Sequence, residues 1–115
     1  MSKRDKGRRG EDEAVDYLSK KGYRIVARNF RFDRGEIDIV AEDGATLVFV
    51  EVKARSGGFG EPEEAVTERK REQLQKVAEG YLVRNNIDDR ECRFDIVAIS
   101  WKGERSLIRH LIDIF

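Results

Sequence analysis

The chain contains very little cysteine, histidine or proline, and each shortage excludes a class of protein. Its 115 residues include one of each: Cys92, His110 and Pro62. A lone cysteine cannot form an intramolecular disulfide, which fits the reducing cytoplasm that we expect for this protein. A lone histidine excludes a histidine-rich zinc site, and we interpret His110 and Cys92 as structural or surface residues. No long apolar run follows the basic N-terminus, so the sequence predicts no signal peptide, membrane span or membrane partner.

The sequence also lacks an excess of charge of either sign. It has 23 Lys and Arg residues against 23 Asp and Glu residues, so no global field attracts nucleic acid. The basic residues are unevenly distributed, however, and we expect residues 1–6 to form a flexible basic arm. Five arginines are candidates to neutralise DNA phosphates: Arg8, Arg9, Arg28, Arg31 and Arg55. The alternative is that these charges only form a solvated face.

Length and periodicity predict a single domain over residues 1–115, large enough for one core and without internal repeat or linker. Hydrophobic periodicity predicts a helix over 7–21, strands over 23–30, 36–42 and 46–53, a helix from about 63 or 67 to 85, and strands over 93–99 and 106–114. Trp101 is expected in the last turn. The order αβββαββ predicts an α/β sandwich with a central mixed sheet, in which an antiparallel meander precedes a right-handed parallel crossover.

Two predicted strands carry charges within apolar runs, where an unpaired charge is costly to bury. Asp38 lies in the first of them, and Glu51 and Lys53 share one face of the second. The intervening Asp43-Gly44 is a strong signal for a two-residue hairpin turn that pairs residue 42 with residue 45. In that register Asp38 is a diagonal neighbour of Glu51. A slip of two residues places Asp38 directly opposite Glu51, and only a one-residue bulge separates their faces.

Two converging carboxylates repel each other unless a proton, a lysine or a metal neutralises them. Carboxylate oxygens suit Mg²⁺ or Mn²⁺, with waters and a substrate phosphate completing the octahedron. Asp38 and Glu51 are therefore candidate metal ligands, and Lys53 could hold an attacking water or stabilise charge that develops on phosphorus. The alternative is an ordinary salt-bridged hairpin whose charged residues reach solvent.

Four further polar residues could belong to this predicted site. Glu11 lies on the apolar stripe of the first helix, although the helix dipole alone would also favour an acid in the first turn. Glu36 shares the predicted face of Asp38 and is a supporting candidate. Lys70 and Gln73 extend the apolar stripe of the second helix, so they could approach the site or form the solvated edge of that stripe.

The order Glu11, Asp38 and Glu51-Val52-Lys53 resembles the PD-(D/E)xK nuclease superfamily. Longer strings resemble the bacterial YraN-like family within it and extend over nearly the whole chain: Gly10-Glu11, Ala14, Tyr17-Leu18, Gly35-Glu36-Ile37-Asp38, Phe49-Val50-Glu51-Val52-Lys53, Glu64-Ala65-Val66, Lys70, Ala78, Tyr81-Leu82 and Arg93-Phe94-Asp95. The resemblance implies a restriction-endonuclease-like fold, related to that of Holliday junction resolvases. It implies that Asp38 and Glu51 bind the metal, that Lys53 is the catalytic lysine, that Glu11 is an auxiliary catalytic acid and that Lys70 is a secondary candidate. A residue other than proline, Ile37, precedes the first motif aspartate, as in many members of the superfamily.

We therefore expect a metal-dependent DNA endonuclease, or a nuclease-like DNA-processing protein, that uses Mg²⁺ or Mn²⁺. The expected partner is nucleic acid, with DNA, including branched DNA, as the leading candidate. Because Holliday junction resolvases act as dimers, the analogy also allows a homodimer. Two alternatives remain open: a noncatalytic nucleic-acid-binding module on a nuclease fold, and a protein interaction domain. Asp38, Glu51 and Lys53 together favour the nuclease, because a binding module does not need all three.

Overall fold

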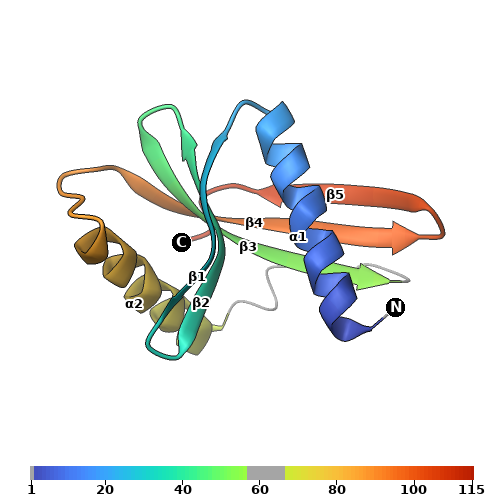
Figure 1. Cartoon of the computed structure of the whole chain (residues 1–115), viewed down its shortest axis with the longest axis horizontal. Coiled ribbons are helices and arrows are strands. Elements are labelled where there is room, and N and C mark those ends of the chain that lie inside the picture. Colours follow the sequence, from blue (N-terminus) through green and yellow to red (C-terminus); the bar gives the residue numbers. More distant parts are fainter. Residues whose placement is uncertain (1, 57–66) are drawn as a thin grey trace.

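The computed structural model describes residues 2–56 and 67–115. Its elements follow the predicted order αβββαββ (Figure 1): α1 (Lys3–Lys20), β1 (Arg24–Phe32), β2 (Gly35–Asp43), β3 (Thr46–Ser56), α2 (Glu68–Arg84), β4 (Cys92–Lys102) and β5 (Arg105–Leu111). No helix within the described ranges is long and apolar enough to cross a membrane.

The five strands form one sheet in the order β1-β2-β3-β4-β5. Neighbouring strands are antiparallel except β3 and β4, which are parallel. Parallel neighbours need a crossover connection, and α2 lies within this connection. The predicted α/β class, the mixed sheet and the antiparallel meander of the first three strands are therefore confirmed.

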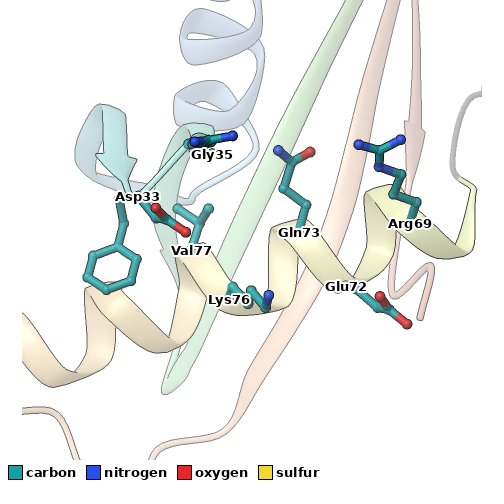
Figure 2. A pocket seen from close by; sticks show the side chains of 9 residues that line it. Asp33, Gly35, Arg69, Glu72, Gln73, Lys76 and Val77 are labelled. Carbon is teal, nitrogen blue, oxygen red and sulfur yellow. The ribbon is translucent and has the colours of Figure 1, made fainter.

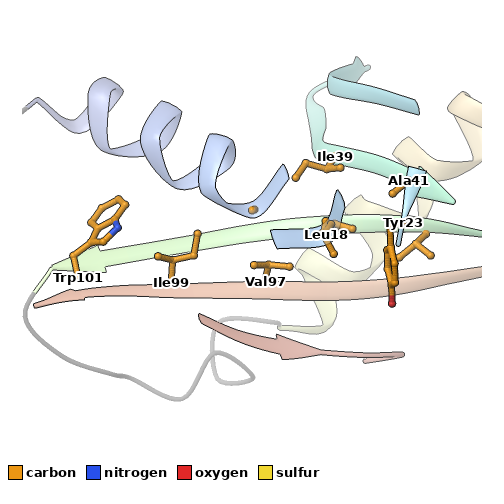
Figure 3. Close-up of a cluster of buried hydrophobic side chains, with 10 residues drawn as sticks. Leu18, Tyr23, Ile39, Ala41, Val97, Ile99 and Trp101 are labelled. Carbon is orange, nitrogen blue, oxygen red and sulfur yellow. The ribbon is translucent and has the colours of Figure 1, made fainter. Parts of the chain in front are cut away.

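The two helices cover opposite faces of the sheet and form separate apolar cores. The core beneath α1 contains Leu18, Val97 and Ile99 (Figure 3). The core beneath α2 contains Phe49 and Tyr81, whose rings meet edge to face at 5.8 Å. Alternate residues of β3 enter the two cores, which explains why this strand is almost continuously apolar.

Two predictions about where these elements begin and end are wrong. The first helix begins at Lys3, because the hydroxyl of Ser2 caps it by accepting a hydrogen bond from the Asp5 N–H at 3.1 Å. Residues 3–6 are thus the first turn of α1 rather than a flexible arm. Trp101 lies in β4 rather than in a turn, and its indole N–H donates to the Glu13 carboxylate over 2.9 Å.

The hairpin between β2 and β3 turns one residue later than predicted. Asp43 pairs with Thr46, so the two turn residues are Gly44 and Ala45. Gly44 has φ +59° and Ala45 has no positive φ, the combination that a two-residue type II′ turn requires. The predicted pairing of residue 42 with residue 45 is therefore wrong, and the alternative register, shifted by two residues, is correct. This register brings Asp38 level with Glu51.

Candidate metal centre and nucleic-acid interface

The candidate site forms where β2 and β3 separate. Their paired positions end at Ile39 and Val50, just before Asp38. Beyond that pair, the Asp38 carboxylate accepts a hydrogen bond from the Val52 N–H at 2.8 Å. A side-chain oxygen thereby takes the place of the backbone acceptor that a continuing ladder would provide. The result is a carboxylate fixed between two strands, beside Glu51.

The neighbouring strand β1 is irregular at the same level. Asn29 has φ 53° and lies between the residues that pair with Ile37 and Ile39, opposite Asp38. Ile37 packs in the core beneath α2, as does Val40, whereas Ile39 packs beneath α1. The alternation of faces that a regular strand over 36–42 would show is therefore broken at Asp38. Asparagine tolerates the left-handed conformation better than most residues, so it can occupy this irregularity in β1.

Asn29 also connects β1 to the acid on α1. Its amide donates to Glu11 Oε1 at 2.8 Å, and Arg28 Nε donates to the same oxygen at 3.0 Å. Only 12% of the Glu11 side chain is exposed, so this acid does face the sheet. The sequence reasoning missed Asn29. The available signal was an asparagine within a run of strand-forming residues, because asparagine is depleted in strands.

Glu51 has two lysine partners on one oxygen and none on the other. Lys53 Nζ lies 3.4 Å and Lys70 Nζ 3.2 Å from Glu51 Oε1. The second oxygen, Oε2, is buried and has no hydrogen-bond partner among the described residues. A buried carboxylate oxygen without a partner is costly, and a cation is one way to satisfy it. Lys70 thus reaches the site from α2.

Asp38 is the titratable group that this environment perturbs most clearly. Burial raises its pKa from the ordinary value of 3.8 to about 6, although the hydrogen bond from Val52 opposes this increase. The negative charges of Glu51, Glu36 and Glu11 raise the pKa further. A cation bound here would favour the ionised carboxylate.

Four of the seven predicted catalytic and supporting residues line one cleft of about 380 Å³ beneath the start of α1, whereas Glu51, Lys70 and Gln73 are not part of its wall. The cleft brings together Glu11, Glu36, Asp38 and Lys53, with Lys6, Gly7, Asn29, Val52 and Ala54 completing its wall. Within residues 2–56 and 67–115, no three His, Cys, Asp or Glu side chains are grouped so that they could hold a metal ion. A metal held by Asp38 and Glu51 alone would need waters or phosphate oxygens to complete its coordination, as Mg²⁺ commonly does.

The five candidate arginines divide into two groups. Arg9 pairs with Glu13 at 3.2 Å and stacks on the Trp101 ring at 4.5 Å, and Arg28 bridges Glu11 and Asp12, so both have structural roles. The exposed group contains Arg31, which has only a long 3.8 Å contact to Glu36, together with Arg8 and Arg55, which form no ion pair within the described chain. Gln73 lies elsewhere, in a separate cleft beside α2 (Figure 2).

The lone histidine has a structural position away from this cleft. His110 Nε2 lies 2.7 Å from Asp95 Oδ2, and its side chain is 2% exposed. Burial opposes ionisation of Asp95, but hydrogen bonds from His110, Arg93 and the Asp113 N–H outweigh it and lower the pKa of this carboxyl. This network joins β4 to β5 and to the C-terminal residues.

Fold and site together define a class: a small α/β protein in which a splayed β-hairpin carries Asp38 and Lys53 at a cleft, with Glu51 in contact with Lys53. The model of the uncharacterised protein family UPF0102 matches residues 10–99 of this chain. This range contains Glu11, Asp38, Glu51 and Lys53. A UPF0102 protein of Persephonella marina is 50% identical over 95 residues, which cover 82% of each chain. A UPF0102 protein of Geobacter metallireducens is 46% identical over 110 residues, 95% of this chain and 90% of the relative. The chain belongs to the UPF0102 family.

Proposed function

We propose that this protein is a metal-dependent nuclease that hydrolyses phosphodiester bonds in DNA, of the YraN-like type within the PD-(D/E)xK superfamily. The observation that carries the proposal is the buried, unpartnered Oε2 of Glu51 beside the fixed carboxylate of Asp38. An oxygen in this position lacks an internal partner and is suited to a hard cation. The likeness of the sequence motifs to the superfamily supports the same assignment.

Asp38 and Glu51 would hold Mg²⁺ or Mn²⁺, which when bound would supply a water of lowered pKa and charge neutralisation at the leaving oxygen. The Val52 N–H keeps the Asp38 carboxylate in a single orientation. Lys53 lines the cleft and can donate to a phosphoryl oxygen, thereby stabilising the negative charge that develops at phosphorus.

The remaining polar residues support this arrangement in different ways. Lys70 helps to neutralise Glu51 from α2. Glu11 is held by Arg28 and Asn29, so in this proposal it positions β1 against α1 rather than binding the metal. Glu36 adds negative charge at the same cleft, which favours cation binding.

The direct test is cleavage of end-labelled four-way junction, flap, duplex and single-stranded DNA in Mg²⁺, Mn²⁺ or EDTA. We expect metal-dependent cleavage that falls at least about 100-fold in Asp38→Asn and in Glu51→Gln, as when one group that stabilises charge in a transition state is removed. Glu79→Gln, which removes an exposed carboxylate from α2, is the matched control and should cleave like the wild type. Cleavage that persists in both site variants would refute the proposal.

A second candidate is a noncatalytic nucleic-acid-binding module. The observation that favours it is that Lys53 and Lys70 already neutralise one oxygen of Glu51 without a metal. It predicts salt-sensitive DNA binding that Mg²⁺ does not change. Titration calorimetry separates the two: Mg²⁺ binding that disappears in Asp38→Asn supports the nuclease, whereas DNA binding without any metal binding supports the module.

A further inference from the structure

A second cleft lies between α2 and the turn that joins β1 to β2 (Figure 2). It encloses about 290 Å³. One of its lining residues, Arg69, directly precedes Lys70, the lysine that contacts Glu51. Residues of the turn and of α2 line it: Phe32, Asp33, Arg34, Gly35, Arg69, Glu72, Gln73, Lys76 and Val77. A Cβ at Gly35 would collide with Val77, so glycine lets the turn approach the helix here.

The polar side chains of α2 form a line along this cleft. Arg69, Gln73 and Lys76 are spaced i, i+4 and i+7, which places them within about 60° of one another around the helix and along about 10 Å of its axis. Figure 2 shows Arg69 and Gln73 extending from the same side of α2 and Glu72 extending from the other side. Glu72 is spaced i+3 from Arg69 and i−4 from Lys76, so it lies between the two cations along the helix.

The three cations of this cleft are not held in ion pairs within the described parts of the chain. Arg34, Arg69 and Lys76 are exposed and form no ion pair there. Asp33 and Glu72 also line the cleft, so it is not a uniformly positive pocket that would hold any single anion. Its positive groups are instead spread along a line, which suits an anion with a repeating charge.

We propose that this cleft binds the sugar-phosphate backbone of a DNA strand on one side of the bond that is cut. This inference rests on the proposed nuclease function and extends it beyond the metal centre. A strand that passes Glu51 and Lys70 would continue along α2, where Arg69 and Lys76 neutralise phosphates and the Gln73 amide donates to a phosphate or sugar oxygen.

The test is the salt dependence of DNA binding, measured by fluorescence anisotropy of a labelled duplex in EDTA between 50 and 200 mM salt, roughly the range over which phosphate contacts are resolved. For the double variant Arg69→Gln/Lys76→Gln, we expect the slope of log K against log[salt] to become shallower by about 1.8, that is, about 0.9 for each lost phosphate contact. The matched control is Lys20→Gln/Arg24→Gln, which removes the same charge from side chains that are 77% and 75% exposed. Arg24 lies at the opposite end of β1 from the cleft, so the control slope should equal that of the wild type.

A slope unchanged in the Arg69→Gln/Lys76→Gln variant, an equal change in the control, or no binding by the wild type would overturn the assignment of the cleft. Parallel cleavage assays with Glu51→Gln keep the two proposals distinct. If cleavage survives in Glu51→Gln while the slope depends on Arg69 and Lys76, the metal centre is wrong and the cleft assignment stands. If cleavage requires Glu51 but the slope is indifferent to Arg69 and Lys76, only the cleft assignment is wrong.

Discussion

Replacing Asp38 with asparagine removes a carboxylate whose ionisation is made costly by burial. The pKa of Asp38 is raised from 3.8 to about 6, a change of about 2 units. At about 1.36 kcal/mol per unit, the ionised carboxylate destabilises the folded protein by about 3 kcal/mol at pH 8. Asparagine has nearly the same shape, and its side-chain oxygen can accept the same hydrogen bond from Val52. We therefore expect Asp38→Asn to raise the free energy of unfolding at pH 8 by up to about 3 kcal/mol while cleavage falls at least about 100-fold.

The contribution of Asp38 to the stability of the wild type should decrease as pH rises. Between pH 3.8 and about 6 the folded protein holds a proton on Asp38 that the unfolded chain has released. Stability from this group therefore decreases as pH rises through that window, and the full penalty is present above it. Because asparagine does not titrate, the advantage of the variant should be large at pH 8 and should shrink toward pH 4.

Urea unfolding in EDTA at pH 5, 6, 7 and 8, for the wild type and Asp38→Asn, measures this difference. In Mg²⁺ the stability advantage of Asp38→Asn over the wild type should shrink or reverse. A metal present at 100 times its dissociation constant would stabilise only the wild type, by about 2.7 kcal/mol. Glu79→Gln, which changes an exposed residue, should be as stable as the wild type at every pH, both in EDTA and in Mg²⁺. An Asp38→Asn protein that is no more stable than the wild type at pH 8, or whose advantage does not depend on pH, would refute the reasoning about burial.

Three further substitutions test how the fold supports the site, each by urea or thermal unfolding. Gly35→Ala should destabilise by about 1–3 kcal/mol, because its Cβ would collide with Val77; unchanged stability would contradict this packing. Asn29→Ala should be less stable than Asn29→Gly by about 1–2 kcal/mol, because only glycine adopts φ 53° without strain; equal stabilities would argue against the left-handed residue in β1. Asp95→Asn should lower the free energy of unfolding at pH 7 by about 3–5 kcal/mol, because it leaves Arg93 without its buried carboxylate. This difference from the wild type should vanish in acid, where Asp95 is protonated below its lowered pKa. A difference that persists in acid would point to packing instead.

Much of the fold was predictable because its signals are local. The period of 3.6 in the helices and the alternation in the strands depend on near neighbours in the chain, so the order αβββαββ and the mixed sheet were predicted correctly. The capping of α1 by Ser2 is also local, but serine is common outside caps, and the predicted start of the helix was late. The hairpin was predicted, whereas its register depended on which residue adopts the left-handed conformation.

The sequence by itself determined that Asp38, Glu51 and Lys53 lie on adjacent strands, because their spacing about a short turn allows few other arrangements. Tertiary structure decided what those groups contact. The separation of β2 from β3 places the Asp38 carboxylate on the Val52 N–H, and the packing of α2 brings Lys70 to Glu51 while Gln73 goes to a different cleft. These contacts join segments distant in sequence, and their geometry follows from how the helices pack on the sheet, which no local pattern specifies.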